Sequence, residues 1–139
     1  MADLMTCDGR FRDEESGYSL VFDDDGRVAY AYLQDSDGRL VGDTWLYNRG
    51  ISPTQPEWKN PENMPFMNPL DFVNQARHDE FRLVESILDV RVDWSEEGEK
   101  VKARVLIRNE PIAILLEGAK PGWCLLAGKD GPLARVLEL

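Results

Sequence analysis

Residues 18–47 read YSLVFDDDGRVAYAYLQDSDGRLVGDTWLY and contain two Asp-Gly pairs, Asp25-Gly26 and Asp37-Gly38. Each pair lies between runs that are rich in apolar residues. Asp-Gly favours a tight hairpin turn, because both central positions of the mirror-image turn need positive φ. The stretch therefore predicts three antiparallel strands joined by two turns, and the rest of the chain is expected to pack around them.

The three predicted strands are apolar on both faces. Two-residue turns would place Phe22 opposite Ala29 and Ala31 opposite Thr44. Because strand side chains alternate, one face then carries Tyr18, Leu20, Phe22, Ala29, Ala31, Leu33 and Leu46. The other face carries Val21, Val28, Tyr30, Tyr32, Val41, Asp43, Trp45 and Tyr47. Such a sheet needs cover on both sides, and a bulge at either turn would reverse the faces beyond it.

The second of these faces holds a dense aromatic set with one acid among the rings. Aromatic side chains beside a polar group can stack a sugar, a base or a peptide ring. The predicted ligand-binding residues are Tyr30, Tyr32, Asp43, Trp45, Tyr47 and, from the following loop, Trp58. The alternative interpretation is that the same rings form core that the loop closes.

Residues 48–68 change character abruptly, with four prolines and several large apolar residues. Proline breaks helices and removes a donor from a strand ladder, whereas Trp58 and Phe66 are too apolar for a disordered linker. We expect an ordered loop folded over the aromatic face as a lid. Asn68-Pro69 then resembles a helix start, with Asn as the cap and Pro in the first turn, and predicts one short helix over residues 69–78.

The second half returns to strands. Residues 88–94 and 101–107 alternate apolar and polar side chains, which predicts a hairpin with Val92 opposite Val101 and Asp93 opposite Lys100. Further short strands are expected over residues 112–116, 123–127 and 134–137. The sequence thus predicts a single mainly β domain over residues 1–139. About eight antiparallel strands would curl into a barrel or a two-layer sheet with one short helix. The alternative is an α+β fold with more helix in residues 69–88.

Charge is distributed unevenly along the chain. The net charge is −10; residues 1–80 hold 16 acids and 7 bases, whereas residues 81–139 hold 10 acids and 9 bases. Binding to nucleic acid needs Lys and Arg to neutralise phosphates, so this distribution argues against it and favours a basic protein partner. No apolar run is long enough to span a membrane and the N-terminus has no secretory pattern, so we expect a cytoplasmic protein with Cys7 and Cys124 reduced.

No catalytic motif, phosphate loop or metal-ligand spacing occurs, so we predict no enzyme activity, cofactor or metal. The two Asp-rich turns lack the flanking ligands of a calcium loop. His78 is the single histidine and is expected at an exposed helix end. The leading hypothesis is a non-catalytic interaction module, an adaptor or inhibitor of a basic partner. The alternatives are a small-ligand-binding β-domain using the aromatic face and the lid, and an enzyme with a site around His78.

Overall fold

The structure, a computed structural model, describes residues 7–59 and 66–138 and arranges their strands in two sheets. The first sheet is antiparallel and follows chain order: β1 (Cys7–Arg12), β2 (Ser19–Asp24), β3 (Val28–Gln34) and β4 (Leu40–Asn48). The second also follows chain order: β5 (Val90–Glu97), β6 (Lys100–Ile107), β7 (Glu110–Leu116), β8 (Trp123–Cys124) and β9 (Arg135–Val136). β8 and β9 pair in parallel, and the other pairs are antiparallel.

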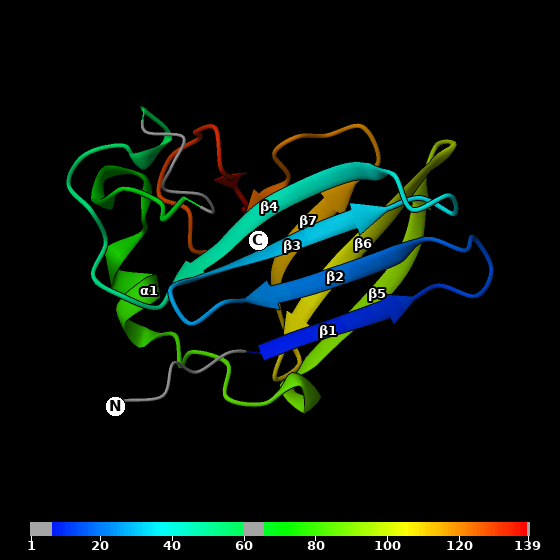
Figure 1. The fold of residues 1–139 in the computed structure, drawn as a ribbon, viewed down its shortest axis with the longest axis horizontal. Coiled ribbons are helices and arrows are strands. Elements are labelled where there is room, and N and C mark those ends of the chain that lie inside the picture. Colours follow the sequence, from blue (N-terminus) through cyan, green and yellow to red (C-terminus); the bar gives the residue numbers. More distant parts are fainter. Residues whose placement is uncertain (1–6, 60–65, 139) are drawn as a thin grey trace.

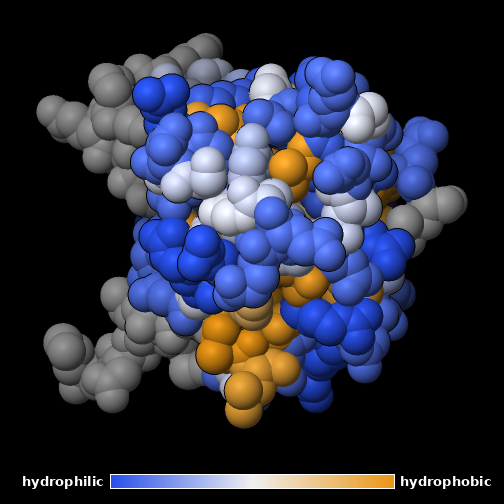
Figure 2. Space-filling model, turned by 90° about the vertical axis from the view of Figure 1, so that its right-hand side faces the viewer, coloured by the Kyte–Doolittle hydropathy of each residue, from blue (hydrophilic) through white to orange (hydrophobic). Residues whose placement is uncertain are grey.

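The two sheets lie one behind the other, with the strands of the second crossing those of the first (Figure 1). The prediction of a mainly β, two-layer fold with one short helix is confirmed. Neither sheet closes on itself among the described residues, so the barrel alternative is wrong. Figure 2 shows the right-hand side of the molecule as largely hydrophilic, with hydrophobic side chains gathered along its lower edge. No helix of residues 7–59 or 66–138 is long and apolar enough to cross a membrane.

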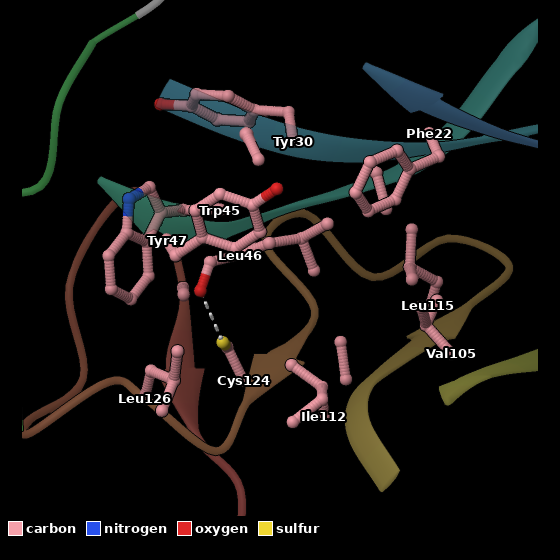
Figure 3. Packing of buried hydrophobic residues seen from close by; sticks show 14 of the residues in the cluster. Phe22, Tyr30, Trp45, Leu46, Tyr47, Val105, Ile112, Leu115, Cys124 and Leu126 are labelled. Carbon is pink, nitrogen blue, oxygen red and sulfur yellow. Dashed lines mark hydrogen bonds between the residues drawn. The ribbon is translucent and has the colours of Figure 1, made fainter. Parts of the chain in front are cut away.

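The core lies between the two sheets. Leu20, Phe22 and Leu33 of the first sheet are fully buried, as are Val105 and Leu115 of the second. Figure 3 shows Phe22 pointing toward Val105 and Leu115 across this space. Fully burying a side chain of this size contributes roughly 1.5–3 kcal/mol, so these contacts are what holds the two layers together.

The register of the first hairpin differs from the prediction, although its faces do not. Phe22 lies opposite Ala31 rather than Ala29, a shift of two residues, because the connection from Asp24 to Val28 is longer than a two-residue turn. An even shift keeps every side chain on its expected face. Ala31 lies opposite Thr44, as predicted.

A bulge in β4 changes the face of one predicted site residue. Tyr30 lies opposite Trp45 as expected, but the register then shifts and Ala29 lies opposite Tyr47 instead of Leu46. The extra residue reverses the alternation within the strand, not at a turn. Tyr47 therefore lies on the inner face with Ala29. The prediction that Tyr47 belongs to the outer aromatic face is wrong.

The second hairpin is also displaced by an even number of residues. Val92 lies opposite Val105 rather than Val101, a shift of four, and the turn forms at Gly98-Glu99. Asp93 consequently meets Arg104, at 2.9 Å, instead of Lys100. The predicted division into an apolar inner face and a charged outer face survives, because four is even.

The segment predicted as a helix over residues 69–78 is divided in two. A 3-10 turn, η2 (Leu70–Phe72), precedes a single α-helix, α1 (Gln75–Glu80), whose cap is Asn74: its side chain accepts a hydrogen bond from the Arg77 N–H at 3.2 Å. Asn68 is not a cap. It is buried, and its backbone N–H donates to Asn48 Oδ1 at 2.9 Å.

The described parts of the 48–68 loop are tied to the first sheet. Glu57 in the 3-10 turn η1 (Glu57–Lys59) forms an ion pair with Arg27 and accepts a hydrogen bond from the Met67 N–H at 2.8 Å. The hydroxyl of Tyr30 donates to the Phe66 carbonyl. The prediction for residues 60–65 falls outside the described residues.

Candidate functional site

The outer face of the first sheet carries two rows of side chains that cross its strands. One row runs Asp8, Asp23, Tyr30 and Trp45, and the next runs Arg10, Val21, Tyr32 and Asp43. Residues directly opposite one another in an antiparallel pair share a face, so the pairing alone brings these side chains together. We call Asp8, Asp23, Tyr30, Tyr32 and Asp43 the Tyr32 face.

Two tyrosines form the aromatic part of the Tyr32 face. The rings of Tyr30 and Tyr32 stack with centroids 5.9 Å apart and planes inclined by 10°. Tyr30 is buried, whereas Tyr32 is partly exposed. Tyr32 therefore presents the accessible ring, and Tyr30 supports it from within.

Acidic residues on neighbouring positions of the sheet influence the Tyr32 hydroxyl. Burial, followed by the charges of Asp23, Asp43 and Asp25, raises the pKa of Tyr32 to about 12. Negative charge nearby disfavours loss of a proton, which would create another anion. This tyrosine is therefore neutral at physiological pH and lies in a negative potential.

Two of the carboxylates themselves carry a desolvation cost. Burial raises the pKa of Asp43, and the positive charge of Lys120 only partly offsets this. Burial also raises the pKa of Asp23, helped by a hydrogen bond to Asp8 and by the charges of Asp8, Asp25 and Asp24. A cation placed beside either carboxylate would favour its charged form and so offset the cost of burial; beside Asp23 it would also offset the repulsion from Asp8, Asp25 and Asp24.

The surface beside Tyr32 is concave. A hollow of about 420 Å³ lies over β1 and β2, lined by Asp8, Gly9, Arg10, Val21, Phe22 and Asp23. Val21 lies directly opposite Tyr32. The hollow thus adjoins the exposed ring and has two carboxylates on its wall.

Cations of the chain cover other aromatic rings but not that of Tyr32. Among the described residues, Arg49 lies over Tyr47, Arg108 over Phe81, Lys129 over Phe72 and Arg135 over Trp123, at 4.4 to 5.8 Å from the ring centroids. None of these four cations lies over the Tyr32 ring; the positive groups at this face include Arg10, in the same row, and Lys120, which acts on Asp43.

The other predicted site residues lie elsewhere. Trp45 is fully buried, with its indole N–H donating to Asn48 Oδ1 at 2.8 Å and its ring stacked on His78 at 6.1 Å. Trp58 meets the ring of Phe72 edge-on at 5.3 Å. The structure brings together Tyr30, Tyr32 and Asp43; it places Trp45, Tyr47 and Trp58 in packing around them.

Asp24 forms a buried network that the sequence did not reveal. It is fully buried, accepts a hydrogen bond from the Tyr47 hydroxyl at 2.6 Å and forms an ion pair with Arg49 at 2.6 Å. Burial, followed by the hydrogen bond to Asp24, raises the pKa of Tyr47. Asp8 and Asp23 were also not among the predicted site residues. Asp8 could have been identified if residues 7–12 had been assigned to a strand that pairs with β2, because this pairing places Asp8 opposite Asp23.

His78 lies at the end of α1 but is only partly exposed. Its Nε2 accepts a hydrogen bond from the Asn48 N–H at 3.1 Å, and burial lowers its pKa. Both the ring stack and the hydrogen bond join α1 to β4. The expectation of an exposed histidine is wrong, and the contacts of this side chain are structural.

Two further acids, Asp25 and Asp35, stabilise turns. Asp25 Oδ1 accepts from the Arg27 and Val28 N–H groups, and Asp35 Oδ1 accepts from those of Asp37 and Arg39, which is turn chemistry. No group of three His, Cys, Asp or Glu side chains able to hold a metal occurs in the described parts of the chain.

Cys124 is a free, buried thiol whose Sγ lies 3.2 Å from the Leu46 carbonyl (Figure 3). Burial raises the pKa of Cys124 to about 12. Because the thiolate is the reactive form, this cysteine is inert at neutral pH.

Comparison of the chain with protein-family models, with curated proteins and with solved structures found no match. The geometry and charge of the Tyr32 face therefore provide the basis for a proposed function.

Proposed function

We propose that the protein is a non-catalytic interaction module whose Tyr32 face binds a basic segment of a partner protein. The observation that carries the proposal is the partly exposed ring of Tyr32, which lies directly opposite Asp43 on β4 and diagonally across from Asp23 on β2. An ammonium or guanidinium group of the partner would lie over the ring and pair with the carboxylates. The chain thereby acts as an adaptor or inhibitor.

The strength of such a contact follows from its parts. An exposed cation–ring contact contributes about 0.5–1 kcal/mol, and each exposed ion pair about 0.2–1 kcal/mol. One ring and two carboxylates then give roughly 1–3 kcal/mol for each cation bound, or about fivefold to 150-fold in affinity. Several cations on one segment are needed for stable binding, which favours a protein over a single small ion.

A cytoplasmic location is part of the proposal. The free thiol of Cys124 is compatible with a reducing compartment, where disulfides are rare. The acidic first half of the chain supports steering of a basic partner toward this sheet, because opposite fields raise the rate of association.

The test is binding of a labelled arginine-rich peptide, measured by fluorescence anisotropy at low and at physiological salt. We expect an affinity that falls with salt and that drops by about two- to thirtyfold in the double variant Asp23→Asn, Asp43→Asn, which removes two exposed ion pairs. Tyr32→Leu is expected to weaken binding with less change in the salt dependence, because it removes the ring and keeps the charges.

The matched control is the double variant Glu14→Gln, Glu15→Gln. It removes two exposed charges from the connection between β1 and β2 and leaves the strands unchanged. If this control weakens binding as much as the loss of Asp23 and Asp43, net charge alone attracts the peptide and the proposed face is refuted.

The alternative, a small-ligand-binding domain, would use the same exposed groups, Tyr32 and Asp43. Trp45→Ala is a poor test of it, since Trp45 is fully buried and its loss would disturb the core. A small organic cation that competes with the peptide and binds without salt dependence would favour this alternative.

A further inference from the structure

The edge of the second sheet at β5 is open among the described residues. β5 has eight residues and pairs on one side with β6. The Val90 N–H donates to the Ile87 carbonyl of the preceding 3-10 turn η3 (Ile87–Asp89), and the backbone groups of residues 91–97 bond to no described segment other than β6. By contrast, the β4 edge of the first sheet is covered, since Gly118 and Gly122 donate to the carbonyls of Val41 and Asp43. An unpaired strand edge is a template for another strand.

The side chains along β5 form a self-complementary sequence. Arg91 and Asp93 lie on the outer face and are 58% and 41% exposed. If two copies of β5 pair antiparallel with Val92 opposite Val92, Arg91 of each copy lies directly opposite Asp93 of the other. On the inner face the same register places Val90 opposite Trp94. This register adds ion pairs between copies to those that Asp93 already makes with Arg91 and Arg104 of its own chain, and it places the apolar side chains together.

The apolar residues of this edge are incompletely covered within one chain. Val92 and Trp94 point toward the core layer but remain partly exposed. A neighbouring strand in the proposed register would cover both. The pairing would therefore add apolar burial to the new ladder of backbone hydrogen bonds.

The distribution of charge permits two copies to approach at this edge. The net charge of −10 derives almost entirely from residues 1–80, which hold 16 acids and 7 bases, and residues 81–139 hold 10 acids and 9 bases. β5 lies in this half and holds one base and three acids; two of the acids, Glu96 and Glu97, lie at its end, beyond the Arg91–Asp93 pairs about Val92. Contact through β5 also leaves the Tyr32 face of each copy, which lies on the other sheet, free for a partner.

We propose that the protein forms a two-fold symmetric dimer in which the β5 strands of two copies pair antiparallel about Val92. The two second sheets become one continuous sheet, and Arg91 and Asp93 make two equivalent ion pairs across the dyad. The same patch serves both copies, which is the geometry of a closed two-fold dimer.

The first experiment is the mass of the purified full chain by size exclusion with light scattering, at roughly 100 μM because edge pairing gives a small interface. We expect a dimer for the wild type. Arg91→Asp and Asp93→Arg each set like charges opposite one another twice, and each is expected to weaken the dimer by at least about tenfold. Arg39→Asp, at an exposed position of the first sheet, is the control and should remain dimeric.

The decisive measurement mixes the two variants. A chain with Asp at 91 and 93 complements a chain with Arg at both positions, so the mixture is expected to form a heterodimer although neither variant dimerises alone. Circular dichroism of each variant separates lost pairing from lost fold. A monomeric wild type, a dimer that both variants leave intact, or folded variants that fail to combine would each overturn the proposal.

Discussion

At the scale of single residues, Asp24 connects three parts of the chain. Its carboxylate accepts hydrogen bonds from the Tyr47 hydroxyl and the Arg49 guanidinium, and Arg49 also donates to the Val84 carbonyl. Asp24 is fully buried and the Arg49 side chain is 13% exposed. A charge in this position needs its partner, because an unpaired buried carboxylate is strongly unfavourable.

We predict that Arg49→Met lowers the free energy of unfolding by about 3–5 kcal/mol, because it leaves the carboxylate of Asp24 without its counter-charge. Urea denaturation at neutral pH measures the change. Arg104→Met serves as the comparison, since its pair with Asp93 is exposed and is expected to cost at most about 1 kcal/mol. Equal losses in the two variants would contradict the assignment.

His78 adds a pH dependence at the same scale. Its folded pKa lies below the ordinary 6.5, because burial disfavours the charged ring more than the negative charge of Asp79 favours it. The unfolded chain therefore takes up the proton more readily, and the contribution of His78 to stability is lost as pH falls from about 6.5 through the folded pKa.

We predict that the wild type loses more stability than His78→Gln over this pH window. Glutamine retains an acceptor and does not titrate, so the difference between the two pH profiles isolates His78 from the carboxylates. An NMR titration of the histidine ring gives the folded pKa directly. A midpoint above 6.5 would refute the sign.

At the scale of elements, β4 is the strand on which both layers meet. The N–H of Gly122 donates to Asp43 at 2.6 Å, and its carbonyl accepts from Arg135 at 2.9 Å. A Cβ at position 122 would lie 2.5 Å from the Ile114 carbonyl oxygen. The close approach of the connection before β8 to β7 thus depends on glycine.

We predict that Gly122→Ala destabilises the protein by about 1–3 kcal/mol, because the added methyl forces backbone to move. The thermal midpoint and the unfolding free energy check it. Gly50→Ala is the matched control: its Cβ would meet only Met67 Cε, at 3.5 Å, an ordinary contact. A Gly122→Ala variant as stable as this control would show that the two layers tolerate separation.

At the scale of the whole molecule, acids crowd one sheet. The pKa of Asp23 is raised, so the folded state binds this proton more tightly than the unfolded chain does. Stability from this group therefore rises as pH falls, and at neutral pH the ionised carboxylate opposes folding. Proteins often keep side chains that reduce stability where function needs them. The electrostatic cost of Asp23 is of this kind if the Tyr32 face binds a partner as proposed.

We predict that Asp23→Asn raises the thermal midpoint at pH 7 while weakening binding of the basic peptide. Asparagine retains a donor for Asp8 and removes the repulsion. The gain should shrink as salt is added, because screening relieves the same repulsion in the wild type. Glu14→Gln, exposed in the β1–β2 connection, should change neither quantity appreciably; a loss of stability in Asp23→Asn would contradict the argument.

Sequence alone determined which side chains face the core. The period of two in Leu20, Phe22, Ala29, Ala31 and Leu33 gave the inner face correctly, although the predicted register was off by two residues. The same holds for β5 and β6, where the shift is four. Alternation is a local property and survives any even displacement of one strand against another.

Tertiary structure decided everything that depends on how elements meet. The bulge at Trp45–Leu46 moved Tyr47 to the inner face, where it reaches Asp24. Pairing with β1 brought Asp8 opposite Asp23. Tyr30 is buried and hydrogen-bonded to the Phe66 carbonyl, so Tyr32 is the more accessible of the two stacked rings. Burial and contact between residues distant in sequence are set by the packing of whole layers, which no single stretch of sequence contains.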